Sequence, residues 1–155
     1  MRDVQNQVDA RGIAIQHVGI RDAHLPFLIK TKDGGFQSVL ARIQFTVELP
    51  EKYKGTHMSR FLEILTPWSQ KPLAEPEMDT MLEDALRRLD AQAADVELAF
   101  KYFVEKKAPV SGRMSLLDYD CRFVGRKQAG EPLVFTLGVD VPFTSLCPCS
   151  KEISD

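Results

Sequence analysis

The sequence lacks the long apolar runs and the strong charge imbalance that mark membrane or nucleic-acid-binding proteins. In 155 residues, no apolar stretch approaches the roughly 18 residues of a membrane span, and the opening residues lack the apolar core of a secretory signal. Twenty basic and 22 acidic residues give a formal net charge of -2, which argues against broad binding to nucleic-acid phosphates. We therefore expect a cytoplasmic protein with no membrane and no nucleic acid among its partners.

Cysteine is scarce and does not form a paired set. The chain has 3 cysteines, and two of them, Cys147 and Cys149, are separated by one residue. This odd number excludes a disulfide framework and is typical of a reducing compartment. A chain of this length buries about two thirds of its unfolded surface and needs no disulfide or metal to fold. The paired thiols therefore suggest a chemical role, whereas Cys121 alternates with apolar residues and is expected in the core.

Several common catalytic patterns are also missing. The sequence has no glycine-rich nucleotide loop, no internal repeat of 20 to 50 residues and no assignable Ser-His-Asp arrangement. His17 and His24 have no cluster of reactive residues around them, and we assign them no chemistry. The remaining candidates for chemistry lie in two short segments described below.

The hydrophobic periodicity predicts an α+β domain. Apolar residues alternate by two in four segments and follow helical spacing in one, while a further segment alternates less cleanly. We predict strands at 39–49, 56–65, 96–104, 117–123 and 133–141, a loop at 66–76, a helix at 78–93, and either a short edge strand or an arm within 1–35. Because strands and helix are segregated, we expect an antiparallel sheet with helices layered on one face.

The first candidate site is Cys147-Pro148-Cys149, directly after the last predicted strand. Pro148 biases the residue before it toward an extended conformation, so the two thiols can project to the same side. A helix beginning at Ser150 and the ammonium of Lys151 would both stabilise a thiolate, which can bind zinc or a similar metal. The alternative is that both cysteines are small buried residues that close a turn.

The second candidate site contains His57, Ser59 and Arg60. On the predicted strand, Arg60 would lie between Met58 and Leu62 on the more apolar face, where a buried guanidinium needs a partner. That partner could be a phosphate, bound together with Ser59 and His57, or a protein carboxylate. An arginine at a sheet edge that reaches solvent is a further alternative.

Together these segments make the chain resemble the N-terminal part of a type IB GTP cyclohydrolase, a prokaryotic family of folate synthesis. The similar segments are 3–5, 9–11 and 18–20; 49–50 and 54–61, which contains Lys54-Gly55-Thr56-His57-Met58-Ser59-Arg60-Phe61; and 142–154, which contains Ser145-Leu146-Cys147-Pro148-Cys149-Ser150. The joint occurrence of the last two blocks is specific, whereas the helix and strand patterns between them are generic.

The resemblance implies a tunnelling fold, in which subunits join their sheets into barrels, a homotetramer, and active sites at subunit interfaces. It implies conversion of GTP and water to 7,8-dihydroneopterin triphosphate and formate, with a divalent metal, zinc or manganese, activating water for attack at guanine C8. Carried over, Cys147 is a metal ligand and Cys149 is the second catalytic thiol, while His57, Ser59 and Arg60 lie beside the triphosphate.

Family members continue beyond the position of Asp155 with a second half that carries further histidine and glutamate residues. We therefore expect residues 1–155 to be the N-terminal tunnelling-fold portion of a longer bimodular subunit, with an incomplete active site. One alternative is a non-catalytic tunnelling-fold subunit that only oligomerises. Another is the tunnelling-fold nitrile reductase of queuosine synthesis, although its nicotinamide-binding motif is absent.

Overall fold

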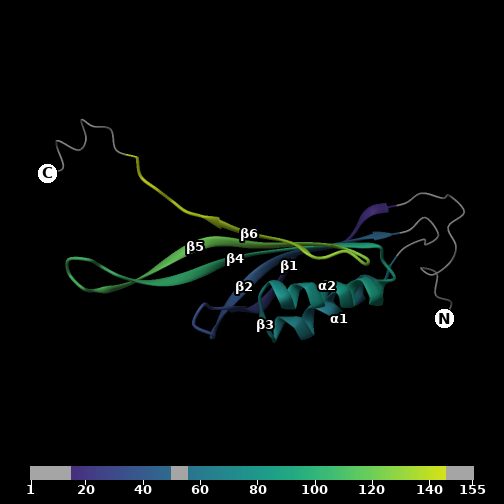
Figure 1. The fold of residues 1–155 in the computed structure, drawn as a ribbon, viewed down its shortest axis with the longest axis horizontal. Helices are drawn as coiled ribbons and strands as arrows, with labels where there is room; N and C mark the ends of the chain where they lie inside the picture. The colour runs from purple at the N-terminus through teal and green to yellow at the C-terminus, as the bar shows by residue number, and fades with distance from the viewer. Residues whose placement is uncertain (1–14, 50–55, 146–155) are drawn as a thin grey trace, which may run out of the picture.

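The computed structural model describes residues 15–49 and 56–145, which form an α+β domain (Figure 1). Its elements are β1 (Ile15–Lys30), β2 (Phe36–Leu49), α1 (Met58–Ser69), β3 (Pro72–Leu73), α2 (Glu75–Leu89), β4 (Ala93–Lys107), β5 (Met114–Gln128) and β6 (Val134–Asp140). Neither helix in this part of the chain is long and apolar enough to cross a membrane. The predicted α+β class is confirmed.

The six strands form one sheet in the order β3-β1-β2-β4-β5-β6. The pairs β1–β2, β2–β4, β4–β5 and β5–β6 are antiparallel. The sheet is nevertheless mixed, because β3 pairs with β1 in parallel through Leu28↔Pro72 and Ile29↔Leu73. The prediction of a purely antiparallel sheet was wrong at this edge, since a two-residue strand between two helices carries no readable alternation.

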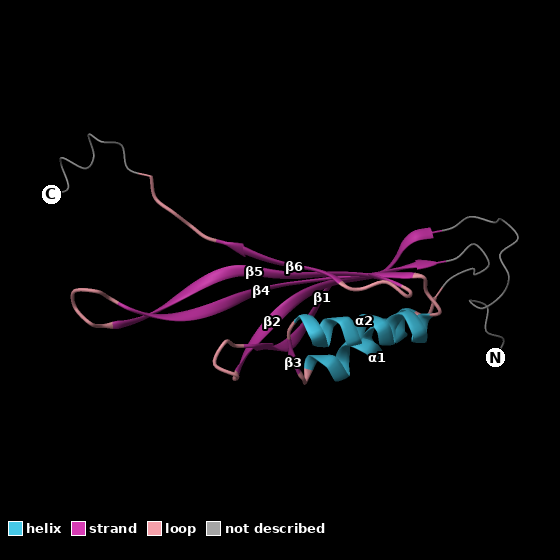
Figure 2. Cartoon of the chain, in the orientation of Figure 1, coloured by secondary structure: helices cyan, strands magenta, loops and turns pink. Residues whose placement is uncertain are grey.

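Both helices lie against one face of the sheet and close the hydrophobic core (Figure 2). Phe45 of β2 meets Phe61 of α1 edge to face, with ring centroids 5.1 Å apart. At Gly125 of β5, a Cβ would lie 2.6 Å from the Sδ of Met78, so α2 approaches the sheet closely where the side chain is missing. The opposite face of the sheet carries mainly charged and polar side chains.

Most of the strand predicted at 56–65 is instead the start of helix α1, and residues 66–69 of the predicted loop at 66–76 continue that helix. The buried residues of α1 recur at helical spacing, at Phe61, Ile64, Leu65 and Ser69. Pro67 lies inside the helix, which explains why the segment was interpreted as a loop. The predicted helix at 78–93 is confirmed as α2, shifted toward the N-terminus.

The four remaining predicted strands are confirmed: 39–49, 96–104 and 117–123 are parts of the longer strands β2, β4 and β5, and 133–141 corresponds to β6, which is one residue shorter at each end. Residues 15–30 of the opening segment form β1, which pairs with β2 along its length apart from two bulges. The rest of the predicted N-terminal arm, residues 1–14, lies outside the described residues.

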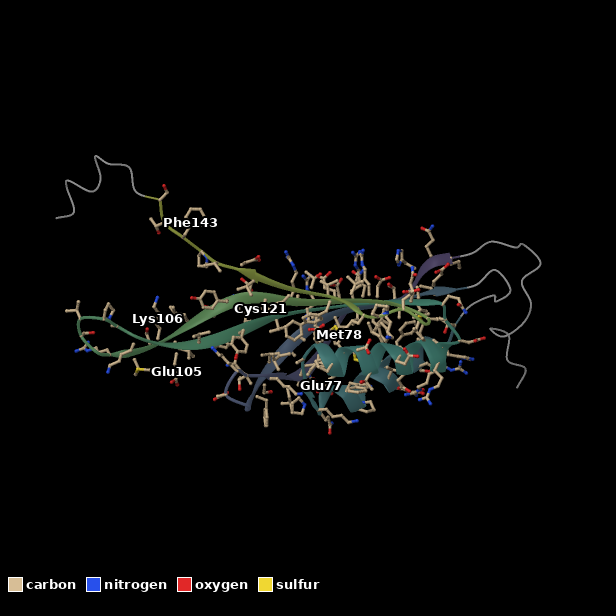
Figure 3. The ribbon with its side chains drawn as sticks, in the orientation of Figure 1. Glu77, Met78, Glu105, Lys106, Cys121 and Phe143 are labelled. Atoms are coloured by element: carbon tan, nitrogen blue, oxygen red, sulfur yellow. The ribbon has the colours of Figure 1, made fainter. Side chains whose placement is uncertain are left out.

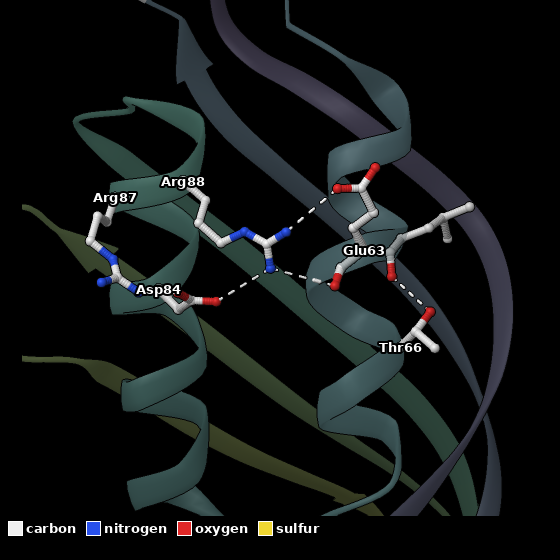
Figure 4. A network of polar contacts seen from close by, with 6 residues as sticks. Glu63, Thr66, Asp84, Arg87 and Arg88 are labelled. Carbon is white, nitrogen blue, oxygen red and sulfur yellow. Dashed lines mark hydrogen bonds and ion pairs between the residues drawn. The ribbon is translucent and has the colours of Figure 1, made fainter.

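Arg88 of α2 compensates for the proline inside α1 (Figure 4). Pro67 has no N–H, so the carbonyl of Glu63 loses its usual partner four residues ahead. The Nη1 of Arg88 donates to that carbonyl at 3.5 Å, while its Nη2 lies 3.5 Å from Oε2 of Glu63. Oδ2 of Asp84 lies 3.7 Å from Nη1 of Arg88 and orients the same guanidinium. One side chain therefore satisfies a helix defect and joins the two helices.

We expect Arg88→Ala to lower the free energy of unfolding by about 1 kcal/mol, because the Glu63 carbonyl loses its donor. Adding Pro67→Ala should recover most of that loss by restoring the helix hydrogen bond. Urea denaturation of both variants and of Pro67→Ala alone measures the coupling. If the two changes are simply additive, Arg88 does not act through the carbonyl that the proline leaves free.

Lys127 joins α2 to β5 from a position that is only 8% exposed. Its Nζ lies 2.7 Å from Oδ1 of Asp79 and 3.3 Å from Oε2 of Glu83, and it donates to the carbonyl of Glu131. The hydrogen bond with Asp79 raises the pKa of Lys127 above its ordinary value. The ammonium is therefore more stable in the folded chain than in the unfolded one.

We expect Lys127→Met to lower the free energy of unfolding by about 1 kcal/mol at pH 8, since the carboxylate partners stay hydrated. Because the folded-state pKa is raised, this contribution is complete below about pH 10 and is lost as the pH rises through that pKa. The difference between parent and variant in urea denaturation should therefore shrink toward pH 11. A difference that grows with pH would contradict the assignment.

Candidate functional site

The N-terminal end of α1 brings together His57, Ser59 and Arg60. His57 is the N-cap in an extended conformation, and its carbonyl accepts the N–H of Arg60 at 3.1 Å. The helix starts here because the apolar face that begins at Phe61 packs on the sheet. Three of the predicted site residues are therefore held within one helical turn.

This helix end is suited to an anion because nothing within the helix neutralises its positive dipole. The first turn of α1 has no acidic residue and its N-cap side chain makes no capping hydrogen bond. By contrast, α2 has Glu75 and Glu77 in its first turn, and Oε2 of Glu77 accepts the N–H of Ala74 at 3.0 Å. The positive end of the helix dipole therefore favours a negatively charged ligand at the start of α1.

Arg60 does not occupy the apolar strand face that the sequence predicted. It is half-buried on the helix, with exposed Met58 and Leu62 nearby in sequence. The prediction that Arg60 is buried on a strand and needs a partner was therefore wrong, because its apolar neighbours recur at helical spacing. Within residues 15–49 and 56–145, no carboxylate lies within ion-pair distance of Arg60.

Cys147 and Cys149 lie outside the described residues, and the predictions for them stay predictions. The last described residue, Ser145, follows β6, whose end at Asp140 pairs with Asp120. The start of α1 lies instead near the end of α2, as the Arg88–Glu63 contact shows. Phe143 accordingly appears at the end of the sheet remote from both helices (Figure 3). The described segment that leads to Cys147 and the start of α1 are thus at opposite ends of the sheet.

Cys121 is confirmed as a core residue. Its side chain is buried beneath the sheet, and burial raises the pKa of its thiol, with further increases from the charges of Asp120 and Asp140. A thiol in such surroundings is seldom ionised and is a poor nucleophile or metal ligand. No group of three or more histidine, cysteine or acidic residues suited to a metal occurs in the described ranges.

The structure also groups residues that the sequence did not connect. A depression of about 680 Å³ at the end of the sheet where β6 begins is lined by His17, Asp95 and Arg126, among others. The Nδ1 of His17 lies 3.9 Å from Oδ2 of Asp95, and the Nε of Arg126 lies 3.0 Å from Oδ1 of the same carboxylate. These residues come from three strands, and only the pairing register reveals their proximity.

The comparisons with known proteins decide the family. A family model described as type I GTP cyclohydrolase folE2 matches residues 1–155. The chain belongs to this family. It is 46% identical over 155 residues to a protein of Maridesulfovibrio salexigens named GTP cyclohydrolase FolE2, covering all of this chain and 60% of that protein. Proteins of the same name from Geobacter sulfurreducens and Nitrosomonas eutropha are also 46% identical, over 99% of this chain and 58% and 57% of their own lengths.

The family resemblance inferred from the two motifs is therefore confirmed. The chain spans about 60% of the length of the curated relatives it matches. Both segments that carry the resemblance, 54–61 and 142–154, lie within the matched residues.

Proposed function

We propose that the protein containing this chain is a metal-dependent GTP cyclohydrolase that converts GTP and water to 7,8-dihydroneopterin triphosphate and formate. The observation that carries this proposal is the match of the family model to the whole chain, together with relatives named GTP cyclohydrolase FolE2. The product is a pterin of the kind used in folate synthesis. A cytoplasmic location accords with the small, odd number of cysteines.

Cys147 is proposed as a ligand of a divalent metal, zinc or manganese, and Cys149 as a second thiol of the site. A thiolate is a common zinc ligand, but it needs further ligands from outside the described residues to form an open catalytic site. When bound, such a metal lowers the pKa of a water molecule and prepares it for attack at guanine C8.

His57, Ser59 and Arg60 are proposed to bind the triphosphate at the start of α1. The guanidinium of Arg60 supplies a charged donor, the Ser59 hydroxyl supplies a neutral one, and the positive end of the helix dipole adds to both. The absence of an acidic residue in that turn supports the assignment. Fixing the triphosphate would hold the purine in register for the reaction.

The described segment that leads to Cys147 runs away from the start of α1, which supports a site shared by two chains. β6 has seven residues, which extend over roughly 20 Å and carry the chain away from the α1 end. In the proposed homotetramer with a tunnelling fold, Cys147 of one copy would meet His57 and Arg60 of another. The antiparallel pairing of five strands and the placement of both helices on one face accord with that fold.

The proposal is tested by incubating the full-length protein with GTP and either manganese or zinc, and by measuring pterin fluorescence after oxidation of the product. We expect a pterin triphosphate from GTP and much less product from guanosine, which lacks the triphosphate anchor. A protein that oligomerises but forms no pterin with either metal would instead be a non-catalytic subunit. NADPH oxidation with a nitrile substrate would indicate the reductase.

A further inference from the structure

The turn between β1 and β2 contains the one Asp–Gly step of the sequence, Asp33-Gly34, and the sequence has no Asn–Gly step. An aspartate before glycine is chemically among the least stable in a protein, because no side chain hinders the glycine nitrogen as it approaches the aspartate carboxyl carbon. Residues 32–35 are exposed, at the end of the sheet where β3 pairs with β1 (Figure 1). This step is therefore accessible to water.

The reaction open to such a step is an acyl transfer within the chain. The main-chain nitrogen of Gly34 attacks the side-chain carboxyl carbon of Asp33, a C–N bond forms, and the carboxyl hydroxyl leaves as water with the proton of that nitrogen. Water then opens the resulting succinimide ring. Opening at the main-chain carbonyl gives isoaspartate, in which the chain runs through the former side chain and is one methylene group longer. The water released is regained, so no further reactant is needed.

In the folded turn, both reacting groups are engaged in hydrogen bonds. The N–H of Gly34 donates to the carbonyl of Thr31 at 3.1 Å. Oδ1 of Asp33 accepts the Thr31 hydroxyl, and it accepts the N–H of Gly35 at 3.4 Å. The bond from the Thr31 hydroxyl is the main cause that lowers the pKa of Asp33 below its ordinary value. The carboxyl group is therefore held ionised, and a carboxylate has no hydroxyl to lose.

We infer that Asp33-Gly34 is the site of spontaneous isoaspartate formation in this chain, and that the hydroxyl of Thr31 suppresses the reaction in the folded protein. The hydroxyl stabilises the unreactive form of the carboxyl group and ties it to residue 31. The carbonyl of the same threonine holds the attacking N–H. Because the hydroxyl belongs to the side chain and the carbonyl to the main chain, a substitution can remove the first and leave the second.

The extra methylene group would lie where the turn sets the register of the hairpin. The N–H of Thr31 donates to the carbonyl of Gly35 at 3.1 Å, and Lys30 pairs with Phe36 directly behind the turn. The Nζ of Lys30 also contacts Oε1 of Glu77, whose other oxygen accepts the N–H at the start of α2. Isomerisation would therefore lengthen the turn beside the contact that joins this hairpin to α2.

The test incubates the full-length protein in neutral buffer and measures isoaspartate at position 33 by peptide mapping and by enzymatic methylation of its free carboxyl group. Thr31→Val replaces the hydroxyl with a methyl group of similar size, and Thr31→Ser is the matched control that keeps the hydroxyl. We expect isoaspartate to form about fivefold faster in Thr31→Val, the factor that corresponds to one lost hydrogen bond. Thr31→Ser should stay close to the parental rate. Asp33→Glu should remove the signal, because the larger ring forms much more slowly.

The parent protein unfolded in urea gives the rate without the fold, and we expect it to equal or exceed that of Thr31→Val. Equal rates in the folded parent and Thr31→Val would overturn the role of the hydroxyl, and so would an equal acceleration in Thr31→Ser. Isoaspartate that accumulates first at another aspartate would overturn the assignment of the site. No isoaspartate at position 33 in the urea-unfolded chain would do the same.

Discussion

Replacing Cys147 with alanine in the full-length protein is expected to abolish metal retention and lower GTP turnover by about a thousandfold or more. The substitution removes the thiolate proposed as a metal ligand, and no group of three or more histidine, cysteine or acidic residues suited to a metal is found among residues 15–49 and 56–145. The fold should persist, because the described core is built from residues 27–123. Metal content by mass spectrometry and pterin formation measure the effect.

Cys121→Ala is the matched control for this result. It also removes a thiol, but one that is buried and has a raised pKa. We expect it to lower the free energy of unfolding by about 1 kcal/mol through the lost sulfur contacts, while metal content and turnover remain at parent values. Equal metal content in parent and Cys147→Ala would show that Cys147 is not a ligand.

Mixing two inactive variants should regenerate activity if the site is shared between chains. Arg60→Ala is expected to weaken GTP binding by about a hundredfold, because its guanidinium is the charged donor at the α1 end. Cys147→Ala is expected to be inactive because it lacks the proposed metal ligand. When the two are co-expressed or unfolded and refolded together, sites that combine intact Arg60 of one variant with intact Cys147 of the other should form, and about a quarter of the parental activity should return.

The control mixes each inactive variant with itself and should show no recovery. Arg60→Lys, which keeps the charge but not the planar fork, should retain more GTP affinity than Arg60→Ala and a similar melting temperature. A mixture that stays inactive, although mass spectrometry shows mixed oligomers, would mean that both groups act within one chain.

Much of the fold could be predicted because single periodicities dominate its longest elements. The alternation from Val39 to Val47 shows one buried face of β2, and the helical spacing from Met78 to Leu89 shows the buried stripe of α2. The helical spacing of α1 was not recognised in the sequence, for a physical reason. Its buried residues are few and also fit the alternation of a strand with two mixed faces, and Pro67 suggests a loop. In the structure Arg88 donates to the carbonyl that the proline leaves unpaired, so the helix continues past it.

The candidate site was only partly predictable for a different reason. The residue types in 54–61 and 142–154 identified the family, because their joint spacing is specific. Their positions in space depend on strand order and helix direction, which no local pattern encodes. For the same reason the sequence did not connect His17 with Asp95, which lie on different strands and meet only in the folded sheet.

The most direct test of the proposed reaction follows a single carbon atom. GTP carrying carbon-13 at C8 is incubated with the full-length protein and manganese or zinc, and the products are followed by NMR. The proposed attack at C8 predicts that the label leaves as formate, in an amount equal to the pterin triphosphate formed. Label that remains in unchanged GTP, or in a purine or pterin product, would contradict it.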